Sequence, residues 1–283
     1  MRSLSVLALL VLAAPASAQP PNVPPDLSGV WTRKYQISNL LDPPASGAGP
    51  IAQDPRYPKT DHNGVPRRAI TEAEREHLIR FTTSWIPDPT SPILQPHTRA
   101  ALEKIVQQEL AGIPHPEMQT MCMPTGVPHI VNILNSTMIL QTPTEVIFLY
   151  ERDHQVRHVY LDRPHSKDQV HTWYGESVGH YEGDTLVVDT IGQNDKTHVD
   201  RFATPHSDRI HVVERYRRSA DGRGIEALVT VEDPVAFTVP WSGRAVYVPA
   251  TGPFLENVCA ENQRREFWPG LDIPVPVDDT PDF

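Results

Sequence analysis

The stretch GHYEGDTLVVDTIG, residues 179–192, decides the fold class of this chain. Its Glu-Gly-Asp tripeptide is typical of a tight turn, and the residues that follow form an apolar run of strand length. Side chains alternate between the two faces of a strand, so Asp189 shares one face with Val187 and Ile191. The stretch therefore predicts a β-hairpin that carries a carboxylate on a face expected to be buried.

The same period of two continues along most of the second half of the chain. Eight segments have strand character: 137–141, 145–151, 156–162, 171–182, 185–192, 209–218, 225–233 and 243–250. Most are joined by turns too short for a crossover helix, and short connections force neighbouring strands to be antiparallel. We predict a mainly β fold, an antiparallel up-and-down barrel or curled sheet of about eight strands. A β-sandwich is the alternative.

The segment DLSGVW, residues 26–31, is strand-like and lies far ahead of the others. Over three residues it resembles the Gly-x-Trp strand that opens lipocalin-like barrels. This resemblance implies that the predicted barrel is lipocalin-like.

The N-terminus, MRSLSVLALLVLAAPASA, has one Arg, an apolar run and small residues at 16 and 18. These features predict a signal peptide, residues 1–18, cleaved after Ala18, and hence a periplasmic or secreted protein. The run is too short for a transmembrane helix, and no later segment is long and apolar enough, so we expect no membrane span.

Three further regions follow: a Pro-rich arm with two helices (19–125), an antiparallel β domain (126–265) and a Pro-rich acidic tail (266–283). The first helix is predicted over 71–85, where Thr71 and Glu74 form a capping box. The second is predicted over 97–112, because apolar residues recur on one helical face until Gly112.

Charge and cysteine usage narrow the class of protein. The formal net charge of -10 argues against a nucleic-acid partner, which needs a basic face. Cys122 and Cys259 are the only cysteines, and in an oxidising compartment they are expected to form a disulfide; two buried free thiols are the alternative. The oligomeric state is left open.

Seven blocks together resemble a family of exported bacterial β-rich proteins of unknown function. They are CMPTGVPHI, QTPTEVIFLYE, VYLDRPH, GESVGHYEGDTLVVDTIGQNDKTHVD, PHSDRIHVVERYRR, VEDPVAFTVPW and ENVCAEN, between about residues 121 and 263. The resemblance implies export and a β-rich domain, and it supplies no reaction. The family pattern has Trp where this chain has Tyr181 and His198, so a family role of the second position does not carry over.

Standard catalytic signatures are missing from the sequence. It contains no GxSxG, HExxH, P-loop or Gly-rich dinucleotide fingerprint, which disfavours nucleotide, flavin and nicotinamide enzymes. Six of the thirteen histidines crowd into residues 165–211, but their spacing matches no metal-ligand pattern. We therefore expect neither a cofactor nor a bound metal.

Acidic residues on apolar strand faces are the best candidates for chemistry. Glu214 shares a face with Val212 and Tyr216, as Asp189 does with its apolar neighbours. Desolvation would raise the pKa of such a carboxyl toward neutrality, which suits acid–base catalysis. The predicted catalytic set is Asp189, Glu214, His158, His206 and His211, and the predicted substrate-binding set is Tyr160, His165, Trp173 and Tyr216. Taken singly, Asp189 and Glu214 are each also explained as members of structural contacts such as a cross-strand ion pair.

Three functions remain open at this point. The first is a cofactor-free lyase, isomerase or hydratase acting on a small apolar or aromatic molecule inside the barrel. The second is a non-catalytic periplasmic protein that binds such a molecule. The third is an envelope interaction protein without a pocket.

Overall fold

The computed structural model describes residues 24–34, 40–57, 86–111, 115, 118–119, 121–133 and 135–259. The predicted signal peptide, the predicted helix over 71–85 and the acidic tail lie outside the described residues.

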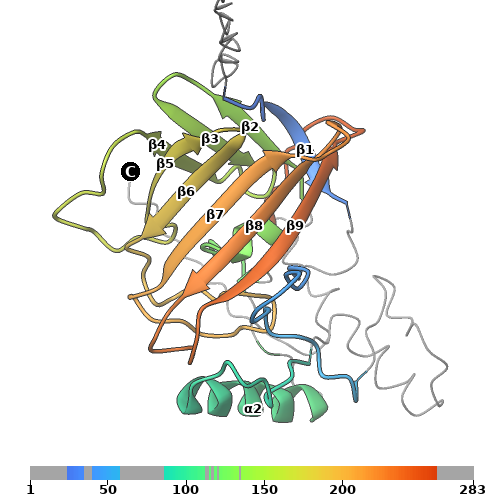
Figure 1. Ribbon diagram of the computed structural model, residues 1–283. Helices are drawn as coiled ribbons and strands as arrows, with labels where there is room; N and C mark the ends of the chain where they lie inside the picture. The colour runs from blue at the N-terminus through green and yellow to red at the C-terminus, as the bar shows by residue number, and fades with distance from the viewer. Residues whose placement is uncertain are drawn as a thin grey trace, which may run out of the picture.

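A closed barrel of nine strands forms the body of the protein (Figure 1). The strands are β1 Gly29–Arg33, β2 Thr137–Gln141, β3 Glu145–Tyr150, β4 Val156–Leu161, β5 Glu176–Glu182, β6 Thr185–Ile191, β7 His211–Arg218, β8 Ile225–Glu232 and β9 Trp241–Pro249. Strand β1 closes the barrel by pairing with both β2 and β9. The prediction of a mainly β, lipocalin-like barrel is confirmed, and the closed barrel excludes the β-sandwich. The additional strand is the early Gly-x-Trp segment.

One pair of neighbouring strands departs from the predicted antiparallel order. β4 and β5 are parallel and share three residue pairs, from Val159↔Ser177 to Leu161↔Gly179, whereas all other neighbours are antiparallel. The connection over residues 162–175 leaves the end of β4, projects from the side of the barrel and returns to the start of β5 (Figure 1). Gly179 allows the two strands to approach, because a Cβ there would lie 2.8 Å from Cγ1 of Val159.

Large side chains fill the interior of the barrel. Phe148, Tyr150, Tyr216 and Trp241 are each at most 2% exposed, and Leu186 on β6 is fully buried. These residues point inward because alternate positions of each strand face the same side of the sheet. The space that the sequence suggested for a ligand is therefore occupied by aromatic rings.

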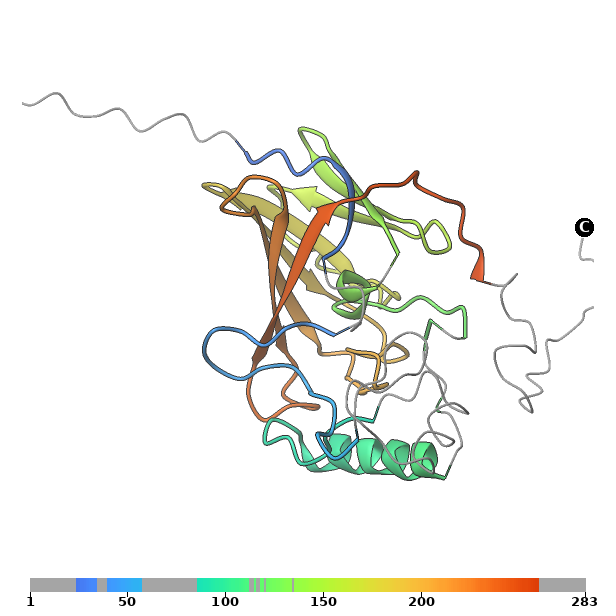
Figure 2. The same ribbon diagram turned by 90° about the vertical axis from the view of Figure 1, so that its right-hand side faces the viewer.

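The helix α2, Pro96–Leu110, lies below one end of the barrel in both views (Figures 1 and 2). It buries Leu102, and Thr98 Oγ1 donates to the carbonyl of Ala236 at 2.9 Å in the β8–β9 connection. The second predicted helix is thus confirmed, although it ends at Leu110. No helix within the described ranges is long and apolar enough to cross a membrane.

A short 3₁₀ helix, η1 (His129–Asn132), is held to the barrel by Tyr247, whose hydroxyl donates to the carbonyl of Val131. Just before it in the chain, Cys122 forms the predicted disulfide with Cys259, which lies after β9. The pairing of the two cysteines is confirmed, and the chain between them contains eight of the nine strands.

Candidate functional site

The two candidate acids face opposite sides of the barrel wall. Glu214 is fully buried and points inward, while the side chain of Asp189 is 38% exposed on the outer surface. The register makes this unavoidable, because Glu214 lies opposite Val188 and Asp189 lies opposite Val213. The prediction of a buried face is confirmed for Glu214 and wrong for Asp189. Both faces of β6 are apolar, so its pattern alone did not specify which one points inward.

Glu214 belongs to a buried ion pair. Arg157 Nη1 donates to Oε1 of Glu214 at 3.0 Å and Nη2 donates to Oε2, with both side chains at most 2% exposed. The same guanidinium donates to Oγ of Ser177 at 3.0 Å and to Oγ1 of Thr190 at 2.7 Å, and the hydroxyl of Tyr216 donates to Glu214 at 2.6 Å. Burial raises the pKa of Tyr216 well above its ordinary value, so this residue stays a neutral donor. The charge of the Glu214 carboxylate is balanced by Arg157 and its oxygens accept hydrogen bonds, which indicates a structural role.

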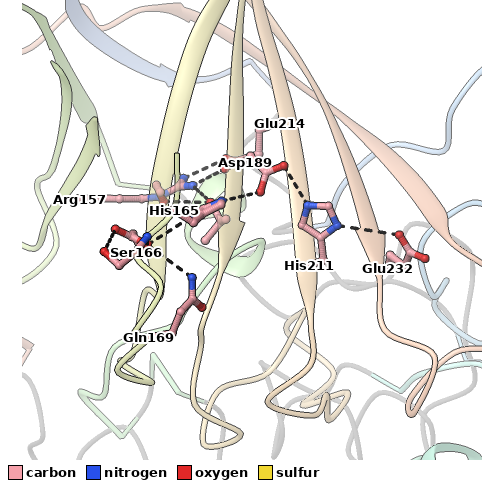
Figure 3. Close-up of polar contacts among 11 residues, drawn as sticks. Arg157, His165, Ser166, Gln169, Asp189, His211, Glu214 and Glu232 are labelled. Carbon is pink, nitrogen blue, oxygen red and sulfur yellow. Dashed lines mark hydrogen bonds and ion pairs between the residues drawn. The ribbon is translucent and has the colours of Figure 1, made fainter. Parts of the chain in front are cut away.

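Asp189 instead links two histidines on the outer surface (Figure 3). His165 Nε2 donates to Oδ1 at 2.9 Å, and His211 Nε2 donates to Oδ2 at 3.1 Å. Each histidine also faces a second carboxylate: His165 Nδ1 lies 3.3 Å from Glu176, and His211 Nδ1 lies 3.9 Å from Glu232. We call these five residues the Asp189 chain. It crosses the outer faces of β5, β6, β7 and β8 and ties the 162–175 connection to the wall.

The contacts within the Asp189 chain shift the pKa values of Asp189 and His211. The hydrogen bond to Asp189 raises the pKa of His211 above 6.5, against a smaller opposing effect of burial. Burial raises the pKa of Asp189, but hydrogen bonds from the two histidines outweigh it and hold that pKa below 3.8. A raised histidine pKa stabilises the fold at low pH, and a lowered aspartate pKa stabilises it at high pH. The bridge therefore contributes most between about pH 4 and 6.5.

Replacing Asp189 with Asn should lower the pKa of His211 toward its ordinary value, because the neutral amide no longer favours the imidazolium. Titration of the histidine ring signals by NMR measures this change. His180, on the exposed part of β5 and paired with Glu182 instead of Asp189, is the internal control, and its ring signals should be the same in both proteins. An unchanged pKa of His211 in the variant would contradict the bridge.

A cleft opens in the wall beside this chain, between the start of β4 and the 162–175 connection. It has a volume of about 490 Å³. Its apolar lining comprises the rings of Tyr160, Trp173 and Tyr174 and the side chains of Val156 and Val170. The two valines are 44% and 77% exposed. We call this feature the wall cleft. It exists because the parallel pairing of β4 begins only at Val159, which leaves the first residues of the strand without a neighbour on that side.

Polar groups complete the wall cleft, and one of them connects it to the Asp189 chain. Glu176 lines the cleft and accepts hydrogen bonds from the amide and the hydroxyl of Ser166 at 2.8 and 2.7 Å. Burial raises the pKa of Glu176, but these bonds and His165 outweigh it, so the pKa lies below 4.5. The carboxylate therefore stays ionised at neutral pH. Further polar lining comes from His158, Ser166, Asp168, Gln169 and Thr172, with Arg157 and Ser177 contributing buried atoms.

The predicted site residues fall into separate places. Glu214 and Tyr216 lie inside the barrel, and Asp189, His165 and His211 form the surface chain. Tyr160, Trp173 and His158 line the wall cleft, where His158 stacks on Tyr160 with ring centroids 6.0 Å apart and lies 3.0 Å from Glu145. Asp189 and Glu214 therefore do not converge on one cavity.

His206 lies apart from all of these groups. Its Nδ1 donates to the carbonyl of Ser207 at 2.8 Å, so in the neutral ring Nε2 accepts from Thr197 Oγ1 at 2.6 Å. Burial lowers its pKa, which favours the neutral form. The hydroxyl of Ser207 accepts from the amide of Arg209 and donates to Asp233, and these contacts fix the turn that follows His206.

Sequence reasoning missed Arg157 and Glu176. Arg157 shares one face of β4 with Val159, as Glu214 shares a face of β7 with Val212. A cation on an apolar strand face was the signal that could have identified a partner for Glu214. Nothing in the sequence marked Glu176, since its role depends on where the preceding connection folds back.

No group of three or more His, Cys, Asp and Glu side chains arranged to hold a metal ion occurs in the part of the chain that the structure describes. Comparisons of the chain with models of protein families, with curated proteins and with solved structures find no match. The family resemblance therefore stays a prediction, and the candidate site rests on its geometry.

Proposed function

We propose that the protein is an exported barrel that binds a small organic molecule in the wall cleft. The observation that carries this proposal is the gathering of three aromatic rings and two exposed valines around one cleft. Its volume lies within the range of about 300–1,000 Å³ that is usual for ligand sites, and apolar lining with a few polar groups is their usual composition. The signal-like N-terminus and the disulfide support export.

Binding has more support than acid–base catalysis. A general acid or base must reach the substrate and have a pKa near the working pH. Glu176 lines the wall cleft, but its pKa is lowered, and Glu214 is already paired inside the barrel. Asp189 lies outside the barrel, on the opposite face of the wall from Glu214. Of the predicted catalytic residues, His158 lines the cleft, but it is paired with Glu145 at 3.0 Å and has neither predicted acid beside it. The geometry therefore favours the ligand-binding alternative over a lyase, isomerase or hydratase, and the cleft favours it over an envelope interaction protein without a pocket.

An uncharged aromatic probe, 2-naphthalenemethanol, should bind with a Kd on the order of 0.1–1 mM, as expected for a fragment-sized molecule. Chemical-shift mapping by NMR should place it at the Trp173 indole and the amides around Val170. Trp173→Ala should weaken binding about tenfold, because one ring face is worth roughly 1.4 kcal/mol.

Valine variants provide the matched control. Val170→Ser in the wall cleft should weaken binding, whereas Val239→Ser should not, because Val239 is also exposed, at 47%, but lies in the β8–β9 connection. Shifts that avoid the cleft, or equal losses in the two serine variants, would overturn the proposal.

A further inference from the structure

The wall cleft has an excess of negative charge among its lining groups. Asp168 and Glu176 are its acidic members, and Asp168 is exposed. The cation that reaches the cleft is Arg157, whose charge is balanced from inside the barrel by Glu214. Carboxylates beside apolar rings attract a positive charge and repel a negative one. Glu176 already has two partners, His165 and Arg163, each at 3.3 Å, so Asp168 is the more available of the two acids.

The rings themselves already hold cations of the protein. The Arg163 guanidinium lies 3.7 Å from the centroid of the Tyr160 ring, and the Lys196 ammonium lies 6.0 Å from the Trp173 ring. Neither cation lines the cleft. Arg163 also donates to Glu176 at 3.3 Å, but its side chain is 46% exposed, so this ion pair is weak. The faces of Trp and Tyr rings attract cations through their quadrupole.

We infer that the wall cleft takes an organic cation, a protonated amine or a related group attached to a flat apolar body. The apolar body lies against Trp173 and the valines, and the positive group lies near Asp168 and Glu176. This inference rests on the proposed function and adds the class of ligand. It also makes Arg163 a competitor for Glu176, because its guanidinium pairs with that carboxylate at 3.3 Å from outside the cleft lining.

Three probes that share one ring system separate charge from shape: 2-naphthylmethylamine (cation), 2-naphthalenemethanol (neutral) and 2-naphthoate (anion). The amine should bind about tenfold more tightly than the alcohol, and the carboxylate should bind more weakly than both, as measured by NMR shifts of the Trp173 indole. Raising the salt concentration from about 20 to 500 mM should reduce the preference for the amine, because exposed charges are screened.

Variants of the exposed charges test the assignment without touching the fold. Asp168→Asn should weaken binding of the amine about threefold and leave binding of the alcohol unchanged. Asp208→Asn is the matched control, since Asp208 is also exposed and lies outside the cleft. Arg163→Gln should strengthen binding of the amine alone.

The outcomes distinguish the two proposals. Binding of the alcohol and the amine with equal affinity at Trp173 would overturn the cation inference and leave the binding function standing. Weaker binding of the amine in Arg163→Gln would likewise overturn the cation inference alone. If none of the three probes shifts the Trp173 indole, both proposals fail.

Discussion

Replacing Glu214 with Gln should lower the free energy of unfolding by about 3–5 kcal/mol, the usual cost of removing one partner of a buried ion pair. The variant leaves the Arg157 guanidinium without a compensating charge at a position where its side chain is only 2% exposed. Burial favours the neutral form of Arg157, and the charge of Glu214 is what holds the pKa of Arg157 above its ordinary value. Urea unfolding followed by circular dichroism measures the loss.

The matched control is Glu226→Gln on β8. Glu226 forms an ion pair with Arg217 at 2.9 Å, as Glu214 does with Arg157, but it lies on the outer face, where both side chains are exposed or partly exposed. Its loss should cost at most about 1 kcal/mol. A double variant, Arg157→Met with Glu214→Leu, should recover much of the stability, because an apolar replacement of the whole pair leaves no buried charge. If Glu214→Gln lowers the free energy of unfolding by no more than Glu226→Gln does, the buried ion pair does not stabilise the barrel as proposed.

The barrel itself was predictable from the sequence because its signal is local. Alternation and turn residues are properties of short segments, and they predicted eight strands. The ninth, β1, was expected only as a strand-like segment ahead of the barrel, through its resemblance to the Gly-x-Trp strand of lipocalin-like barrels. The inward position of Glu214 was predictable from the same alternation. The position of Asp189 was not, because Leu186 and Val188 on one face of β6 are as apolar as the residues on the other.

The wall cleft was not predictable because its origin is tertiary. The strand predicted over 171–182 begins only at Glu176, so its first five residues belong to the 162–175 connection. The sequence does not show that this connection returns the chain to a parallel neighbour of β4. Tyr160 and Trp173 were identified as binding residues, and the structure brings them together, but at an outer groove and not in the lumen. The lumen was expected to be open, yet a barrel of this size is filled when its inward positions carry Phe, Tyr and Trp.

Removing the disulfide should cost a similar amount of stability, by a different mechanism. The bond joins residues 137 positions apart, and in the chain-entropy model closing so long a loop restricts the unfolded chain by about 5 kcal/mol at 25 °C; losses of about 2–5 kcal/mol are typical. The Cys122→Ser/Cys259→Ser variant should therefore unfold at lower urea concentration and lower temperature than the wild type.

The location of the bond adds a local effect to this global one. Cys259 is buried, its amide donates to Asp153 at 2.7 Å, and the segment after β9 is also held by the amide of Leu255, which donates to Glu151 at 2.9 Å. Without the cross-link this segment is held by such hydrogen bonds and by the contact of Phe254 with the His154 ring, so amide hydrogen exchange over residues 250–259 should accelerate more than in β6 or β7. Reductant should lower the stability of the wild type and leave the double variant unchanged. A double variant with the urea midpoint of the wild type would show that the cross-link does not restrict the unfolded chain.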